Sequence, residues 1–366
     1  MPRVAIIILN WNGWADTIEC IDSIHQFSNS DYDIILVDNH SSDGSIENIR
    51  RYCEGAGEIG PPDNSSIHLF EVPEDEIERH AFDHASYERL EPCCRLILIK
   101  NNENYGYARG NNIGIKFALY VLKSEYILIL NNDVIITDKE MLGKLTEAVN
   151  RDARIGAVSP VLRSTTGEIQ RTCTGNIPGF LDFIFVYTFI GQRLFRENRV
   201  LKRHFNYDYS FEQPKEFGVL GGSCILFRSQ TLTDVGLFDE NTFLYWEEYI
   251  IGRKLAERGW KLLLNPETGV VHKGESCIKN LNLKSWARYW STKSELYYIE
   301  NYAALNPVKR SIIRFALLLE TTLALCDTVL KGNESKFDRV YELKIISVLL
   351  GSSAKDPSES PGELVG

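Results

Sequence analysis

The amino-acid sequence predicts an α/β fold with a mostly parallel, Rossmann-like sheet flanked by helices and a C-terminal helical extension. Two observations support this fold class. Apolar runs of strand length alternate with helical periodicity over residues 4–130, and this order is typical of parallel strands joined through helices. Over residues 283–350 the strand-like runs give way to helical spacing alone.

The first part of the chain supplies the alternating pattern. The expected strands are residues 4–9, 33–37, 96–99 and 126–130. The expected helices begin at Asp16, which forms a capping-box-like pair with Glu19, at Ser45 and at Asn111. Because helices separate the strands, we expect right-handed crossovers and a doubly wound sheet. Residues 53–95 interrupt this order with glycine, proline and acidic residues, which predicts a surface insertion with local structure.

Past residue 135 the pattern becomes mixed. Residues 155–161 and 219–227 favour strands, whereas the aromatic-rich residues 180–199 fit either a flap over a ligand or a helix in the core. Residues 312–330 are apolar but carry three charges at helical spacing, which predicts a helix with a polar stripe rather than a membrane span. The tail after Gly351 is rich in Ser, Pro, Gly and Glu, so we expect it to be disordered.

Composition narrows the class of protein. Of the 366 residues 44% are hydrophobic and 25% charged, so the chain can bury a sizeable core. The net charge of −10 disfavours a nucleic-acid partner, because contact with phosphates needs a basic surface. The eight cysteines have no metal-binding spacing, which favours reduced core cysteines in a cytoplasmic protein. Residues 1–9 lack the basic start and the cleavage site of a signal peptide.

Polar side chains follow the predicted strands at the points where the strands end. Asp133 closes the segment Asn131-Asn132-Asp133, and Asp38 with Asn39 follows the second strand. Since ligands of open α/β sheets bind at the carboxyl ends of the strands, these groups should face one site. Asp133 suits a hard divalent cation, Mg²⁺ or Mn²⁺, unless it caps a helix. Asp38 suits a ribose hydroxyl.

Two further strand-end loops carry polar groups. Residues 10–13 (Asn-Trp-Asn-Gly) offer amides and backbone N–H groups to a base or a phosphate, or form a simple turn. The loop after the third strand spaces Gly106, Gly110 and Gly114 four apart, which differs from the GxGxxG fingerprint and argues against a dehydrogenase. Arg109 in this loop either clamps a base or a phosphate or lies in solvent.

Two acids and a histidine lie farther along the chain. Glu247 and Glu248 follow an aromatic run and begin an expected helix. Aromatic cover would raise the pKa of a carboxyl group and suit it to general-base work, although paired acids are also common at an exposed helix start. His272 follows a short strand and is either a third metal ligand or a structural residue.

Taken in order, these segments resemble family 2 glycosyltransferases with the GT-A fold, especially the rhamnosyltransferase and galactofuranosyltransferase-like branch. The matching segments are IIILNWNG, IILVDNHSSDGS, KNNENYGYARGNN, ILILNNDV, GLFDE, FLYWEEYIIGRKLAERGW and VVHKGES. Each motif is weak alone, whereas the whole series over residues 4–276 is specific. The resemblance implies a nucleotide-sugar-binding half (1–135), an acceptor-binding half (136–280), a helical region (281–350) and a tail (351–366).

The resemblance also implies a role for each matching residue. The residues that would contact the nucleotide sugar are Asn10, Asn12, Asp38, Asn39, Arg109, Asn112, Asn132 and Asp133. Asp133 would hold the metal together with His272. Glu248 would take the proton of the acceptor hydroxyl, and Glu247 would bind hydroxyls of the acceptor or the donor.

The sequence departs from the family pattern at three positions. Asn131 stands where the D-x-D motif has its first Asp, Glu248 where the base is usually Asp, and Ile250 where another acid often follows. The first change removes a negative charge from the metal site. Two alternatives therefore stay open: a catalytically inactive nucleotide-sugar-binding relative, and a nucleotidyltransferase, although residues 10–13 lack the basic groups that such an enzyme needs in its phosphate loop.

The implied function is inverting transfer of a sugar from a dTDP- or UDP-linked donor to a hydroxyl of a glycan or lipid-linked glycan. Such a reaction belongs to the synthesis of cell-surface polysaccharides or glycoconjugates, and the expected location is the cytoplasm. Peripheral contact with the inner face of the cell membrane is a further hypothesis, because Lys309, Arg310 and Arg314 begin the apolar helix over residues 312–330. A packed core helix or a contact in a homo-oligomer is the alternative for this helix.

Overall fold

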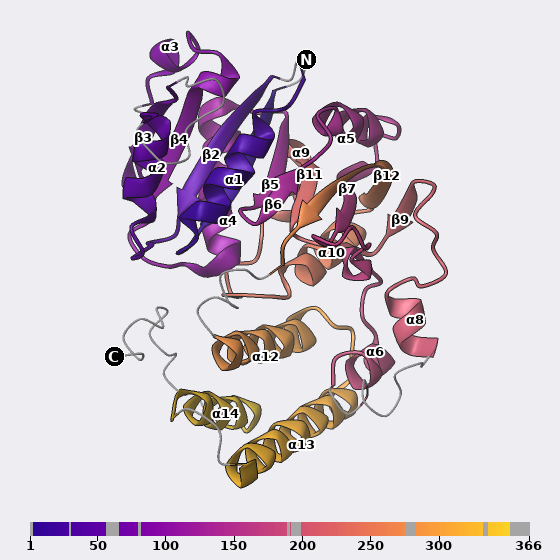
Figure 1. The fold of residues 1–366 in the computed structure, drawn as a ribbon. Coiled ribbons are helices and arrows are strands. Elements are labelled where there is room, and N and C mark those ends of the chain that lie inside the picture. Colours follow the sequence, from indigo (N-terminus) through magenta and orange to yellow (C-terminus); the bar gives the residue numbers. More distant parts are fainter. Residues whose placement is uncertain are drawn as a thin grey trace.

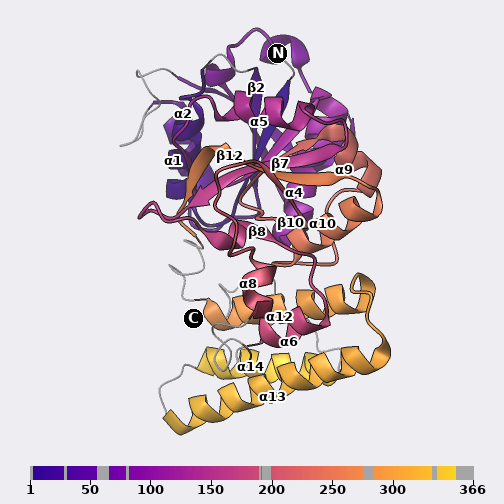
Figure 2. The ribbon, with the colours of Figure 1, turned by 90° about the vertical axis from the view of Figure 1, so that its right-hand side faces the viewer.

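The computed structural model describes residues 3–28, 31–55, 66–79, 82–188, 191, 199–274, 283–331 and 336–351. Figure 1 shows an α/β domain with a layer of helices below it, formed by the C-terminal part of the chain together with α6. After a quarter turn, Figure 2 shows the same two layers, with α13 on the side of the helical layer that faces away from the sheet.

Ten strands of the described chain form one sheet, in the order β3-β4-β2-β1-β5-β11-β7-β12-β6, with β9 paired to β12. They are β1 (Val4–Asn10), β2 (Tyr32–Asp38), β3 (His68–Pro73), β4 (Arg95–Lys100), β5 (Tyr126–Asn131), β6 (Val134–Ile136), β7 (Ile155–Arg163), β9 (Lys215–Phe217), β11 (Cys224–Arg228) and β12 (Lys261–His272). The first five strands pair in parallel, and β11 is antiparallel to both of its neighbours. A separate ribbon joins β8 (Thr174–Gly175) to β10 (Val219–Leu220). The predicted mostly parallel sheet is confirmed.

Helices cover the sheet and build the second layer. They are α1 (Trp14–Ile24), α2 (Ser45–Cys53), α3 (His84–Tyr87), α4 (Gly106–Lys116), α5 (Met141–Asn150), α6 (Phe180–Phe185), α8 (Arg199–His204), α9 (Ser229–Val235), α10 (Glu247–Glu257), α12 (Lys284–Asn301), α13 (Pro307–Lys331) and α14 (Lys336–Leu349). Every residue of β2 is buried, as expected for a parallel strand with both faces covered. The apolar runs that predicted these strands reflect this burial.

The chain reverses its direction across the sheet at β1. From β1 it passes outward through β2 to β3 and β4, and β5 then returns to the opposite side of β1. Ligands of open α/β sheets bind at such a switch point, because the loops that leave the two strands diverge there. The loop over residues 10–13 and the segment over residues 131–133 both lie at this point.

The structure corrects three local predictions. Helix α1 begins at Trp14, so Asp16 lies within its first turn and accepts a hydrogen bond of 2.6 Å from the Lys273 ammonium instead of capping the helix. Residues 219–227 form two strands rather than one, because the chain breaks at Gly221 and Gly222. The interruption over residues 53–95 contributes the edge strand β3 to the main sheet, although residues 56–65 and 80–81 lie outside the described residues.

Two other expectations fall partly or wholly outside the described residues. The segment over residues 180–199 begins as helix α6, which packs its buried Phe183 into a core, while residues 189–190 and 192–198 lie outside the described residues. The expected disordered tail after Gly351 also lies outside them. Among the cysteines that the structure describes, the expectation of core positions is wrong for Cys93 and Cys326, which are exposed.

A second hydrophobic core joins the helical layer to the α/β domain. It is rich in aromatic rings, and Trp246 of the α/β domain packs within it against Phe183 and Tyr298. The helical extension is therefore attached through a packed interface. The exact division of the chain at residues 135 and 280 stays a prediction. Within the described residues, every helix is too short or too polar to cross a bilayer.

Candidate active site

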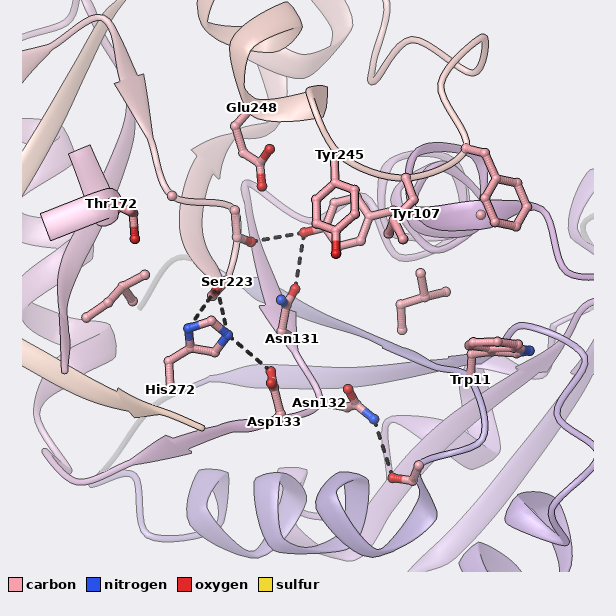
Figure 3. Close-up of a pocket in the computed structure, with 18 of the residues that line it drawn as sticks. Trp11, Tyr107, Asn131, Asn132, Asp133, Thr172, Ser223, Tyr245, Glu248 and His272 are labelled. Atoms are coloured by element: carbon pink, nitrogen blue, oxygen red, sulfur yellow. Dashed lines mark hydrogen bonds and ion pairs between the residues drawn. The ribbon is translucent and has the colours of Figure 1, made fainter. Parts of the chain in front are cut away.

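A pocket of about 570 Å³ lies at the carboxyl edge of the sheet, at the switch point between β1 and β5. Of the predicted site residues, Asn39, Asn132, Asp133, Glu248 and His272 line it. Figure 3 shows Glu248 reaching in from one side and the side chains of Asp133 and His272 lying together across the cavity. The fold thus brings together residues that are far apart in the sequence.

Asp133 and His272 form a pair at the ends of neighbouring strands. Asp133 Oδ1 lies 3.4 Å from His272 Nε2 (Figure 3). The Gln170 amide donates to the His272 carbonyl at 2.8 Å, so the Gln170 oxygen faces His272 Nδ1, also at 2.8 Å. That oxygen can only accept, so Nδ1 carries a proton. The Nε2 atom faces the Asp133 carboxylate, and the Ser223 hydroxyl oxygen lies 3.2 Å from the same nitrogen.

The donor set of this pair fits a divalent cation. A carboxylate oxygen and an imidazole nitrogen are both ordinary metal ligands. Among the described residues there is no cluster of three or more His, Cys, Asp or Glu side chains that could hold a metal ion. The first D-x-D position cannot add a carboxylate, because Asn131 stands there and its side-chain oxygen lies 3.2 Å from the Tyr107 hydroxyl. A cation at this pair would need further ligands from a substrate and from water.

Glu248 enters the pocket from the start of α10. Burial raises the pKa of its carboxyl group above the ordinary value, and hydrogen bonds from backbone N–H groups, including that of Gly222, counteract this only in part. The fit against Gly222 is tight, since a Cβ at this glycine would lie 2.1 Å from Glu248 Oε1. A raised pKa suits a carboxylate that must accept a proton near neutral pH.

Glu247 precedes Glu248 but is absent from the pocket lining. It is buried, and its Oε1 has no hydrogen-bond partner among the described residues. Burial first, and the neighbouring charge of Glu248 second, raise the pKa of Glu247 well above its ordinary value. Because Glu247 does not line the pocket, its predicted contact with substrate hydroxyls has no support in this geometry and stays a prediction.

The turn before α10 is strained. Tyr245 and Trp246 have φ angles of 69° and 72°, and such left-handed values are unfavourable for bulky side chains. Trp246 is held in this conformation by stacking on Phe183 at 5.8 Å between ring centroids and by contact with Tyr298 at 5.2 Å. The second core therefore fixes the turn that presents Glu248 to the pocket.

The first two strand-end loops are tied together by side-chain hydrogen bonds. The Asn10 amide donates to Asp38 Oδ1 at 2.8 Å, and Asp38 Oδ2 accepts from the Ser41 backbone N–H at 2.9 Å. Asn12, which has a φ of 50°, accepts from the Ser42 backbone N–H at 2.8 Å. Asn10, Asn12 and Asp38 lie beside the pocket rather than in its lining. In this structure they brace the loops, and their contact with a nucleotide stays a prediction.

Asn39 and Asn132 reach the pocket itself. The Asn39 amide donates to Asn104 Oδ1 at 2.7 Å, and Asn39 Oδ1 accepts from the Asn101 amide at 3.0 Å, so the side chain joins the second loop to the third. The Asn132 amide donates to the Thr17 hydroxyl oxygen at 3.0 Å. These bonds hold the pocket-lining amides in fixed positions.

Arg109 and Asn112 lie away from the pocket lining. The Arg109 guanidinium is exposed and sits 3.7 Å from the centroid of the Tyr105 ring. Asn112 is buried and bonds with both the backbone N–H and the carbonyl of Phe238, at 3.1 and 3.0 Å. The geometry favours a structural part for Asn112, and nucleotide contact by either residue stays a prediction.

Several lining residues had no role in the sequence analysis. Trp11 stacks on Trp286 with ring centroids 5.7 Å apart, and both line the pocket, so α12 of the helical layer forms part of its wall. Trp11 was present in a quoted motif, whereas Gln170 and Trp286 lie outside all of those motifs. Their place in the site depends on the tertiary fold.

A buried hydrogen-bonded chain leads away from the pocket at Tyr249. The Tyr249 hydroxyl bonds with Tyr187, whose own hydroxyl lies 2.7 Å from His204 Nε2. His204 Nδ1 lies 3.4 Å from Asp182 Oδ1. These groups anchor α6 and α8 to the pocket wall next to Glu248, and they have no recognisable sequence spacing.

Comparison with known proteins identifies the family. The model of a family described as "Glycosyltransferase like family 2" matches residues 2–288, and the chain belongs to this family. The chain is 24% identical over 228 residues to the low-salt glycan biosynthesis hexosyltransferase Agl10 of Haloferax volcanii, covering 62% of this chain and 61% of that protein. It is 27% identical over 156 residues to an N-acetylglucosaminyl-diphospho-decaprenol L-rhamnosyltransferase of Mycobacterium tuberculosis, covering 40% and 47%. The chain thus spans less than two thirds of the length of these relatives.

A solved structure supports the fold. The mannosyltransferase PcManGT from Pyrobaculum calidifontis, determined in complex with GDP-Man and Mn²⁺, superposes with a TM-score of 0.52. The match covers 95% of this chain and 87% of the mannosyltransferase at 16% sequence identity. At this identity the likeness concerns the fold, and it confirms the GT-A fold that the sequence predicted.

Proposed function

We propose that this chain is an inverting glycosyltransferase that transfers a sugar from a nucleoside diphosphate to a hydroxyl group of a glycan or lipid-linked glycan. The observation that carries the proposal is the arrangement across the pocket. Glu248, with its raised pKa, faces the Asp133–His272 pair over a cavity wide enough for a sugar. Membership of glycosyltransferase family 2 supports this interpretation.

In the proposed reaction Glu248 accepts the proton of the acceptor hydroxyl. The acceptor oxygen forms a bond to the anomeric carbon while the bond from this carbon to the diphosphate oxygen breaks. The nucleoside diphosphate leaves with the bonding electron pair, and the single displacement inverts the anomeric configuration. Asn39 and Asn132 lie on the wall where the donor would bind, and the paired rings of Trp11 and Trp286 offer an apolar face to a sugar.

Asp133 and His272 would hold a divalent cation in this scheme. When bound, the cation supplies charge neutralisation for the leaving diphosphate. The imidazole ligand favours Mn²⁺ over Mg²⁺, because Mg²⁺ prefers oxygen ligands throughout its shell. Mn²⁺ in the complex of the mannosyltransferase PcManGT agrees with this choice.

The donor and the acceptor are proposed from chemistry and from relatives. We retain dTDP- and UDP-linked sugars as donors. The name of the mycobacterial relative contains a diphospho-decaprenol acceptor, which supports a lipid-linked glycan as the acceptor here. A nucleotidyltransferase would instead release pyrophosphate, and the absence of basic residues from residues 10–13 disfavours it.

Turnover and binding by a Glu248→Gln variant test the proposal. Removal of a general base costs about 10²–10⁴-fold in rate, whereas the neutral isostere should leave nucleotide binding unchanged. Glu257→Gln on the same helix is the matched control, because Glu257 is exposed and pairs with Arg253 at the end of α10. The proposal fails in favour of an inactive relative if the wild type binds nucleotide sugars but transfers none of them to any of a panel of glycan acceptors.

A further inference from the structure

Helix α13 presents an uncharged apolar face to solvent. Its exposed large side chains are Val308, Ile312, Phe315, Leu319 and Leu323, with between 44% and 68% of their surface accessible. Their spacing of three or four residues places them on one side of the helix. Over residues 311–326 every fully exposed position is uncharged, whereas a helix facing water normally carries its charges there.

The opposite side of α13 is packed against the protein. Ile313 and Leu317 are buried in the second core, and Thr321 is buried beside them. The neighbouring helix α14 continues the pattern with exposed Val340 and Leu343. A helix that is buried along one side and apolar along the other is suited to lie flat on an apolar surface.

The helical layer also differs from the rest of the chain in charge. Residues 283–351 contain ten Lys or Arg and seven Asp or Glu, a balance of +3 within a chain of net charge −10. Lys309 is exposed at the start of the apolar face, and Lys344 follows Leu343 on α14. Basic groups beside an apolar stripe complement the negative surface of an anionic bilayer.

We propose that the exposed faces of α13 and α14 bind the surface of an anionic lipid bilayer. Phe315 and Leu319 would enter the boundary between headgroups and acyl chains, with Lys309 at the level of the headgroups. A second copy of this chain is a weaker candidate, because a two-fold contact would bring two segments of +3 against each other.

The proposed bilayer contact lies on the far side of the helical layer from the pocket. Trp286 at the start of α12 lines the pocket, and Tyr289 on the same helix packs against Tyr341 of α14 with ring centroids 5.9 Å apart. The bilayer surface would thus be separated from the pocket wall by the thickness of the helical layer. Delivery of a lipid-linked acceptor along this path rests on the proposed function, whereas the lipid contact itself does not.

Co-sedimentation with vesicles tests the proposal. We expect the wild-type chain to sediment with vesicles of phosphatidylglycerol and phosphatidylcholine, and to bind pure phosphatidylcholine more weakly. The double variant Phe315→Ser/Leu319→Ser should bind the anionic vesicles roughly tenfold less tightly, since it removes two inserted apolar side chains. Both positions are exposed, so the variant should fold. Tyr120→Ser is the matched control, because Tyr120 is 56% exposed on the α/β domain.

Two results would overturn the proposal. One is that the wild type does not bind anionic vesicles. The other is that the double variant binds them as tightly as the wild type, and if it also changes a dimer into a monomer, the face serves a second copy. The measurement uses no sugar transfer, so a failure of lipid binding is separate from a failure of the proposed reaction. Transfer to a short soluble acceptor by the double variant checks that its pocket is intact.

Discussion

The two walls of the pocket satisfy their polar groups in different ways. The side proposed to bind the donor, called the donor wall, is formed by the loops that carry Asn10, Asn39 and Asn132, and each of these amides is hydrogen-bonded to a neighbouring loop or helix. The side proposed to bind the acceptor, called the acceptor wall, is formed by Glu248 and the turn before α10, with Glu247 buried next to Glu248 in the sequence. Both carboxyl groups have raised pKa values, and Glu247 Oε1 has no partner among the described residues.

This difference suits the two walls to different parts of the proposed reaction, the binding of a ligand and the acceptance of a proton. A network of satisfied amides is stable without a ligand and keeps a binding surface rigid. A carboxyl group out of water is unfavourable in its charged form, so it needs a surrounding structure that holds it there. Here that structure includes the strained residues Tyr245 and Trp246 and the second core behind them. The acceptor wall therefore depends on packing against the helical layer.

The largest effect is expected for Gly222→Ala, which should displace Glu248 on the acceptor wall. Its Cβ would lie 2.1 Å from Glu248 Oε1, and the end of this flexible side chain can move aside. We expect the rate of transfer to fall about 10²–10³-fold, within the range for a lost general base, while thermal stability changes little. Gly143→Ala is the control, because a Cβ there would meet no atom within 4 Å. An unchanged rate would mean that the position of Glu248 is not critical.

Asp133→Ala tests the proposed cation site at Asp133 and His272. The variant leaves His272 without its partner carboxylate, so binding of the proposed Mn²⁺ should weaken. We expect the stabilisation of the wild type by UDP or dTDP to require Mn²⁺ and to disappear in the variant. Differential scanning fluorimetry with each nucleotide, with and without Mn²⁺, measures this. An equal shift without metal would argue for nucleotide binding by the donor wall alone.

Asn39→Ala probes the donor wall itself. The substitution removes Asn39 Oδ1, which accepts from the Asn101 amide and from the Tyr105 backbone N–H, whereas Asn104 Oδ1 keeps its bond from the Gly106 N–H. Because unsatisfied buried groups are unfavourable by roughly 1–3 kcal/mol each, we expect a loss of about 2–4 kcal/mol in the free energy of unfolding. Urea denaturation gives this value. A loss below about 0.5 kcal/mol would show that the loops are held by other contacts.

Glu295→Gln offers a smaller, pH-dependent effect behind the acceptor wall. Burial first, and the charge of Glu320 second, raise the pKa of Glu295 from 4.5 to about 8. The folded chain then holds a proton that the unfolded chain releases above pH 4.5, so this group lowers stability as pH rises from about 4.5 to about 8. The variant should therefore gain at least about 1 kcal/mol on the wild type between pH 5 and pH 8. Parallel curves in chemical denaturation at the two pH values would contradict the raised pKa.

On the donor wall, the sequence predicted the strands and helices more accurately than the contacts of individual side chains. The apolar runs of β1, β2 and β5 are buried at nearly every residue, so their burial was visible as hydrophobicity. Asp133 and Glu248 sit where an element ends or begins, and such positions can be located from a pattern. The position of Arg109 was harder to predict. Helix α4 begins at Gly106 rather than at the expected Asn111, so Arg109 belongs to its first turn, where its side chain is exposed.

Other features depend on contacts that no local pattern records. The orientation of Gln170 follows from its bonds to His272, and these two residues meet only because β12 lies beside β7. The expected single strand over residues 219–227 overlooked the break at Gly222, which the approach of Glu248 requires. Contacts between segments that are distant in the chain cannot be predicted from the local pattern of a single sequence.

The stack of Trp11 on Trp286 links the first loop of the chain to the helical layer. The family match ends at residue 288, shortly after Trp286, so the domain that defines the family stops inside the wall of the pocket. A chain cut before α12 would keep every acid and amide of the proposed chemistry. It would also separate Trp11 from Trp286 and open one side of the cavity, through which water would reach the proposed donor. Helix α12, in which the family match ends, would therefore be part of what keeps the proposed reaction dry.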